Sequence, residues 1–167
     1  MVCNLLPNGK EIADQNGPRD AGGSVAASRL GYTFFVPPLA IDHLGIAVRD
    51  LDAACRVYEA LGFSVAAREE VPHEQVRVAM LPVGESRIEL LEPTGPASTV
   101  ARFLEKRGEG LHHYALRVTD LEGTVARVKQ AGIRLVKDEI QIGAGGHRYV
   151  FLHPSATGGV LIELVEE

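Results

Sequence analysis

The fold of this chain is decided by one stretch, Ile41-Asp-His-Leu-Gly-Ile-Ala-Val-Arg-Asp-Leu51, whose pattern recurs 70 positions later as Leu111-His-His-Tyr-Ala-Leu-Arg-Val-Thr-Asp-Leu121. Both copies begin with the alternation of a β-strand and end with an aspartate where a helix N-cap belongs. Gly62 and Gly132, also 70 positions apart, stand where the two following helices should end. An internal repeat of this kind indicates two copies of one structural unit.

Each copy continues with three further segments of strand character. In the first copy these are Phe63–Glu69, Val76–Leu81 and Arg87–Leu91, and in the second they are Ile133–Lys137, Tyr149–Leu152 and Val160–Val165. A short helix at about Ser98–Arg107 links the copies. The sequence therefore predicts an α+β fold in which two tandem βαβββ modules form one curved mixed sheet with a concave face.

The predicted domain begins only after a long first segment. Residues 1–38 are rich in Gly, Asn, Ser and Asp, and we interpret them as a flexible N-terminal extension. The domain is expected to span 40–167. Within it, module one covers about 40–93, the linker helix about 98–107 and module two about 111–166.

Composition excludes several classes of protein. The formal net charge of −5 argues against a nucleic-acid-binding protein, which usually presents a basic face. No apolar run is long enough for a membrane span, so no membrane partner is expected. The chain has two cysteines, Cys3 and Cys55, which do not make a disulfide framework. A reducing compartment fits this usage, and the cytoplasm is the default location.

Strand alternation assigns the polar residues of the repeat to one face of the sheet. Leu44 and Ile46 should pack under the helix, so His43 points to the opposite face. His113 points the same way in the second copy, whereas the register of His112 matches the helix side. Small residues beside these positions should leave room for a substrate: Gly45, Ala47 and Ala115.

Each module also contributes one glutamate to that face, because Arg87-Ile-Glu-Leu90 matches Leu161-Ile-Glu-Leu164. The resulting set consists of two imidazoles and two carboxylates, from His43, Glu89, His113 and Glu163. Such a set suits a divalent ion such as Co²⁺, Ni²⁺, Mn²⁺ or Zn²⁺. Four protein ligands on an octahedral ion would leave two positions for water or a chelating substrate.

Several longer motifs resemble those of methylmalonyl-CoA epimerases, a family of the vicinal-oxygen-chelate superfamily. They are Ile41-Asp-His-Leu-Gly-Ile-Ala-Val48, Glu89-Leu-Leu-Glu-Pro93, Gly108-Glu-Gly-Leu-His-His113, Phe151-Leu-His-Pro154 and Gly158-Gly-Val-Leu-Ile-Glu-Leu164. The resemblance covers Ile41 to Glu166. It implies a glyoxalase-like fold, an acyl-CoA substrate and a homodimer. It also implies epimerisation of (2R)- and (2S)-methylmalonyl-CoA by metal-assisted abstraction of the C2 proton through an enolate.

The resemblance further implies site residues. His43, Glu89, His113 and Glu163 match the metal ligands of the family, with Co²⁺ as the expected ion. Glu163 is by analogy one of the catalytic acid/base groups. Some relatives place a second glutamate where this chain has Val78. The second acid/base is therefore open, and the candidates are a metal-bound water or one of Glu69, Glu70, His73 and Glu74.

Two other functions compete with this one. A glyoxalase I-like lyase or isomerase acting on a thiol adduct would share the four ligands and differ in its pocket. A metal-free binding or resistance protein would use the same fold around an apolar or aromatic cavity. The chain has no Trp and only 5% aromatic residues, which disfavours such a cavity.

Overall fold

A computed structural model describes residues 40–166 of the chain. The strands are β1 (Ala40–Ala47), β2 (Ala67–Val71), β3 (Val76–Val83), β4 (Ser86–Pro93), β5 (Gly110–Val118), β6 (Gln141–Ile142), β7 (Arg148–Leu152) and β8 (Leu161–Glu166). The α-helices are α1 (Leu51–Ala60), α2 (Thr99–Arg107) and α3 (Leu121–Gln130), and two 3₁₀ turns are η1 (Ala144–Gly146) and η2 (Pro154–Ala156). The extension predicted at 1–38 lies outside the described residues.

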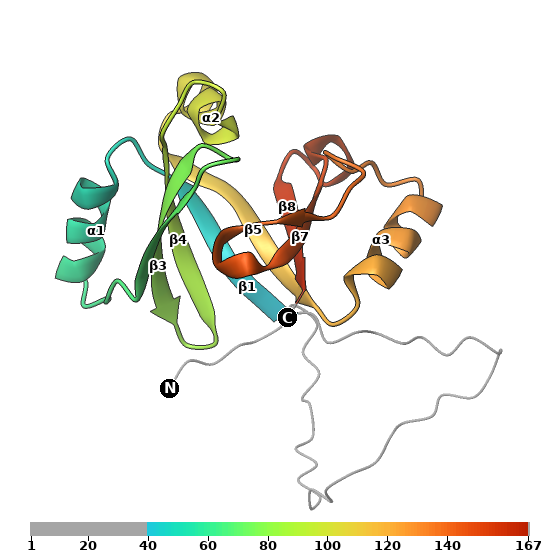
Figure 1. Ribbon diagram of the computed structural model, residues 1–167, viewed down its shortest axis with the longest axis horizontal. Coiled ribbons are helices and arrows are strands. Elements are labelled where there is room, and N and C mark those ends of the chain that lie inside the picture. The colour runs from blue at the N-terminus through green and yellow to red at the C-terminus, as the bar shows by residue number, and fades with distance from the viewer. Residues whose placement is uncertain (1–39, 167) are drawn as a thin grey trace, which may run out of the picture. The chain divides into compact units, whose positions relative to one another are not determined.

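The strands form one curled, mixed sheet of eight strands in the order β2-β3-β4-β1-β5-β8-β7-β6. The two halves of the sheet have the same arrangement: β1 pairs in parallel with β4 in the first half, and β5 pairs in parallel with β8 in the second. The two halves join where β1 runs antiparallel to β5. Helices α1 and α3 flank the outer sides of the sheet (Figure 1). The predicted α+β fold is thus confirmed.

Both predicted helix starts and both glycine stops are confirmed. The side chain of Asp50 accepts a hydrogen bond from the amide of Ala53, and that of Asp120 accepts one from Gly123. Gly62 and Gly132 follow the helices with φ of 93° and 70°, a left-handed conformation that glycine adopts without strain. These local signals start and stop the repeated helices at equivalent positions.

Each long helix covers an apolar cluster on the convex side of its half of the sheet. Under α1 the buried residues are Val48, Leu51, Cys55, Ala79, Leu81 and Leu90. Under α3 they are Val118, Leu121, Val125, Leu135, Val150, Leu152 and Leu164. Burying these side chains provides the main driving force for folding, and it directs the repeated His and Glu residues to the concave face.

One predicted strand is wrong. The segment Ile133–Lys137 makes a single bridge, Leu135 to Leu152, and β6 forms only at Gln141–Ile142. Both pieces lie along the same edge of β7, since Val136 donates to the carbonyl of Phe151 at 2.8 Å and Gln141 pairs with Tyr149. Between the two pieces Asp138 and Glu139 are exposed and form no strand pairing.

Another predicted strand is displaced along the chain. The segment predicted at Phe63–Glu69 becomes β2 at Ala67–Val71. Its first residues, Phe63 and Val65, pack against the cluster under α1 before strand pairing begins. Their apolar alternation therefore reflects contact with the helix.

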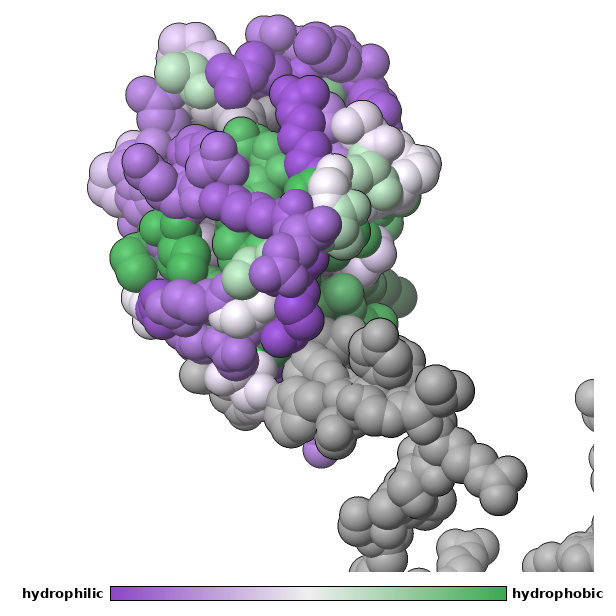
Figure 2. Space-filling view, turned by 90° about the vertical axis from the view of Figure 1, so that its right-hand side faces the viewer, coloured by the Kyte–Doolittle hydropathy of each residue, from purple (hydrophilic) through white to green (hydrophobic). Residues whose placement is uncertain are grey.

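The face of the molecule shown in Figure 2 is mainly hydrophilic. In the view of Figure 2, hydrophobic residues form separate patches between hydrophilic ones. Within 40–166, no helix is long and apolar enough to cross a membrane.

Candidate metal centre

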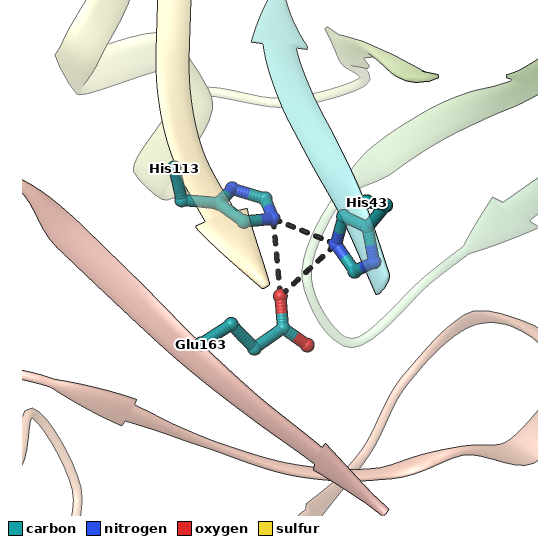
Figure 3. A group of neighbouring side chains, drawn as sticks. All are labelled: His43, His113 and Glu163. Atoms are coloured by element: carbon teal, nitrogen blue, oxygen red, sulfur yellow. Dashed lines mark hydrogen bonds and ion pairs between the residues drawn. The ribbon is translucent and has the colours of Figure 1, made fainter. Parts of the chain in front are cut away.

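Three buried side chains from three strands point toward one another on the concave face (Figure 3). The Nε2 atoms of His43 and His113 lie 3.0 Å apart. The Oε2 atom of Glu163 lies 3.3 Å from Nε2 of His43 and 3.0 Å from Nε2 of His113. Because β1, β5 and β8 are neighbours in the sheet, both halves of the repeat supply this triangle.

The triangle fits a divalent metal ion. Metal–ligand bonds of about 2.1 Å place neighbouring ligands roughly 3.0–3.4 Å apart on an octahedral or tetrahedral ion. The three observed separations, 3.0, 3.0 and 3.3 Å, match that range. Two imidazoles and a carboxylate are also the donors that first-row divalent ions take in proteins. His43, His113 and Glu163 could therefore hold a divalent metal.

Glu89 lies at the side of this triangle. Its Oε2 atom is 3.6 Å from Nε2 of His43, and its Oε1 atom accepts a hydrogen bond from Nε of Arg87 at 3.2 Å. The carboxylate is buried, with its side chain 9% exposed. All four residues predicted from the repeat thus lie together, with Glu89 slightly further out than the other three.

A β-bulge turns Asp42 to the same side as His43. Ile41 pairs with Leu116 and His43 pairs with Ala115, so Asp42 is an extra residue in the ladder. Its Oδ1 atom lies 2.9 Å from Nδ1 of His43. Sequence reasoning missed this contact, because strict alternation sends neighbouring side chains to opposite faces.

The Asp42 carboxylate also binds two arginines. Oδ1 lies 2.5 Å from Nη2 of Arg87, and Oδ2 accepts from Nε of Arg117 at 2.9 Å. These contacts with His43 and the arginines outweigh burial, which acts in the opposite direction, and hold the pKa of Asp42 well below its usual range. The aspartate is therefore a fixed anion behind the His43 ring.

A second bulge corrects the prediction for His112. Gly45 pairs with His113 while Ile46 pairs with Leu111, which leaves His112 as the extra residue of β5. Its side chain does not enter the core under α3. It lines the same cleft as Glu89 and Glu163, with its Nδ1 atom 2.9 Å from Nδ1 of His113. The register argument failed because a bulge breaks the two-residue period of a strand.

The buried charged groups of the site shift one another's pKa values. Burial lowers the pKa of His43, but hydrogen bonds with Asp42 and Glu163 and the charge of Glu89 outweigh it and raise the pKa to about 9. Burial raises the pKa of Glu163, yet the two histidines lower it to about 2. Burial and the neighbouring His113 lower the pKa of His112 to about 3. The negative charge around His43 thus favours a cation at this position.

Small residues near the ligands have a different role from the predicted one. A Cβ atom at Gly45 would lie 2.2 Å from Cε1 of His113, so glycine makes room for the histidine ring. Ala47 and Ala115 have no exposed surface and pack in apolar clusters. Space for a substrate comes instead from an open cleft beside the triangle.

The cleft is lined by both apolar and polar side chains. The apolar side chains are Val71, Val76, Val78, Leu91, Val100, Ala144 and Phe151. Glu74 lines the cleft together with Glu89 and Glu163, and Tyr149 donates to its carboxylate at 2.7 Å. Glu69 and Glu70 line a different cavity beside Arg68. Of the carboxylates considered for the second acid/base, Glu74 is the one that shares the cleft.

A curled sheet built from two βαβββ halves, with a histidine and glutamate site at their junction, defines the vicinal-oxygen-chelate class. Residues 42–151 match the Glyoxalase/Bleomycin resistance protein/Dioxygenase superfamily. The mitochondrial methylmalonyl-CoA epimerase of Homo sapiens is 38% identical over 126 residues, covering 74% of this chain and 72% of the human protein. The ethylmalonyl-CoA/methylmalonyl-CoA epimerase of Cereibacter sphaeroides is 40% identical over 127 residues, covering 74% and 95%.

A solved structure agrees with these similarities. A Streptomyces coelicolor methylmalonyl-CoA epimerase variant in complex with 2-nitronate-propionyl-CoA matches with a TM-score of 0.74 and 42% identity, covering 77% of this chain and 94% of that chain. The chain belongs to the methylmalonyl-CoA epimerase family of the superfamily.

Proposed function

We propose that this chain interconverts the two C2 epimers of methylmalonyl-CoA. The observation that carries the proposal is the buried triangle of His43, His113 and Glu163, open to a cleft, in a chain 38–40% identical to curated epimerases. The C2 hydrogen of this substrate lies between a thioester and a carboxylate, so removing it as a proton generates an enolate. The alternative of a lyase acting on a thiol adduct has no comparable support among these relatives.

We propose His43, Glu89, His113 and Glu163 as the ligands of a divalent ion. Two neutral imidazoles and two carboxylates carry a formal charge of −2, which a divalent cation balances. When bound, the ion supplies a Lewis acid for the negative charge that develops on the enolate oxygen. Co²⁺ is the proposed ion, with Ni²⁺, Mn²⁺ and Zn²⁺ as the other candidates, because each accepts mixed nitrogen and oxygen ligands.

Epimerisation also needs two proton-transfer groups on opposite faces of the enolate. We propose that the Glu163 carboxylate takes the C2 proton from one epimer and that Glu74 returns a proton from the other face. Glu74 comes from the β2–β3 turn of the first half, whereas Glu163 comes from β8 of the second. The hydroxyl of Tyr149 orients Glu74 by its hydrogen bond of 2.7 Å. One proton leaves C2 and one is added, so the substrate changes only its configuration.

The test follows solvent deuterium exchange at C2 of methylmalonyl-CoA by NMR, with Co²⁺-loaded protein. We expect rapid exchange that a chelator abolishes and that Glu163→Gln lowers by at least about 100-fold. Glu59→Gln, an exposed change on α1, serves as the matched control and should leave the rate unchanged. Absence of exchange in fully metal-loaded wild-type protein would exclude the epimerase function.

We further propose that the protein is a homodimer. Three large apolar side chains of the central strands are exposed on the convex side, namely Ile41 (51%), Leu44 (37%) and Leu111 (54%). They lie between the two helix-covered clusters, where a second copy could bury them. Light scattering should give twice the monomer mass, and Leu44→Glu should reduce it to the monomer mass.

Two expectations from the sequence remain proposals. We propose a catalytic unit at 40–167, with modules at about 40–93 and 111–166 and a linker helix at about 98–107, because the repeat delimits these segments.

We also propose a cytoplasmic location. Its support is the cysteine usage, in which Cys55 is buried and unbridged.

A further inference from the structure

In both halves of the repeat, the residue that precedes the inward-pointing histidine occupies a β-bulge. Asp42 precedes His43 in β1, and His112 precedes His113 in β5. Each contacts the Nδ1 atom of the histidine that follows it, in both cases at 2.9 Å. The two positions are therefore equivalent in the fold, yet one holds a carboxylate and the other an imidazole.

The hydrogen-bond chemistry assigns the hydrogen on the His112 ring. If Nε2 of His113 is a metal ligand, it carries no hydrogen, so the hydrogen of that ring is on Nδ1. Nδ1 of His113 then donates, and Nδ1 of His112 accepts. The hydrogen of His112 consequently lies on its own Nε2 atom. In the first half the carboxylate of Asp42 likewise accepts the Nδ1 hydrogen of His43, but a carboxylate has no hydrogen of its own to donate.

The His112 ring lies at the cleft with its Nε2 atom accessible. The ring is held edge-on between Phe103 of α2 and His113, at centroid distances of 5.0 and 5.2 Å. His112 lines the cleft beside the triangle and the adjoining cavity next to Tyr149. Among the described residues, no buried side-chain nitrogen or oxygen lacks a hydrogen-bond partner. The Nε2 atom of His112 makes no hydrogen bond among these residues. It is therefore not fully buried, and it is accessible.

We propose that His112 is a further substrate-binding residue, which donates its Nε2 hydrogen to an oxygen of the malonyl head group. This inference rests on the proposed function. A neutral donor fixed in direction suits a carboxylate or enolate oxygen, because a hydrogen bond to a charged oxygen is stronger than one between neutral groups. The same ring supports His113 through Nδ1, so His112 connects substrate binding to the orientation of a ligand.

Two substitutions separate these two roles. In His112→Asn the amide oxygen can replace the acceptor Nδ1, but no donor reaches the position of Nε2. In His112→Gln the amide nitrogen can replace the Nε2 donor, while the acceptor for His113 is lost. His153→Asn is the matched control, because His153 is the partly exposed N-cap of the η2 turn and an asparagine can still accept from the amide of Ser155.

The two variants should show opposite losses. For His112→Asn we expect Co²⁺ affinity within about threefold of wild type and a loss of about tenfold or more in kcat/KM. For His112→Gln we expect Co²⁺ affinity, measured by calorimetry, to fall by about tenfold. Its kcat/KM at saturating Co²⁺ should exceed that of His112→Asn. His153→Asn should change neither quantity.

The tautomer of wild-type His112 is an independent readout. In Zn²⁺-loaded protein, long-range ¹H–¹⁵N correlation spectra should show the hydrogen of His112 on Nε2 and that of His113 on Nδ1. A hydrogen on Nδ1 of His112 would overturn the proposal, as would an active His112→Asn variant with wild-type kcat and KM. Failure of the proposed function is distinguishable, because the wild-type protein itself would then exchange no C2 hydrogen.

Discussion

Replacing Asp42 by asparagine tests whether the bulge before His43 orients a metal ligand. Asp42 is 3% exposed and accepts from His43 and Arg117 at 2.9 Å. Removing one partner of a buried ion pair costs roughly 3–5 kcal/mol, because the remaining charge stays buried. The side chains of Arg87 and Arg117 are 23% and 25% exposed and can recruit water. We therefore expect a loss of about 2–3 kcal/mol in the free energy of unfolding.

The same substitution should weaken metal binding by about 10–100-fold, because a neutral amide orients the imidazole less firmly and makes it a weaker base. Urea denaturation of metal-free protein measures the first effect, and calorimetric titration with Co²⁺ measures the second. Asp52→Asn is the control, since Asp52 is exposed on α1 and its ion pair within 40–166 is with the exposed Arg68. If Asp42→Asn and Asp52→Asn behaved alike in both measurements, the positioning argument would be refuted.

Three further predictions address the titration, the packing and the chemistry of the site. In metal-free protein the raised pKa of His43, about 9 against 6.5, stabilises the fold fully below pH 6.5, and this contribution disappears as the pH rises through 9. Urea denaturation should show a loss of roughly 2–3 kcal/mol between those pH values, and a flat profile would contradict it. Gly45→Ala should lower Co²⁺ affinity by at least about tenfold, since the added Cβ displaces the His113 ring, and wild-type affinity would disprove this. Glu74→Gln should slow epimerisation by at least about 100-fold while one epimer still exchanges its C2 hydrogen without inversion. Glu70→Gln is its control, and equal effects of the two changes would exclude Glu74.

Much of the site could be read from the repeat. His43 and His113 recur at one offset, and each half places its glutamate on the same face as its histidine, so the four residues were expected together. Strand alternation sufficed for this because it depends only on the two-residue period of a regular strand. It failed at His112, where β5 carries an extra residue opposite β1. It also failed at Ile133–Lys137, where an apolar pattern did not show that the edge strand is interrupted.

The sequence by itself determined the fold of two repeated halves, the helix boundaries and the four repeated His and Glu residues that face inward. These features follow from local propensities, capping residues and short-range periodicity, which act over a few residues. Only the tertiary structure decided which neighbours support those residues. The bulges at Asp42 and His112 depend on pairing between strands about 70 positions apart, and the contact of Glu74 with Tyr149 joins opposite halves of the repeat. Such contacts are set by how the whole sheet closes, which no local pattern encodes.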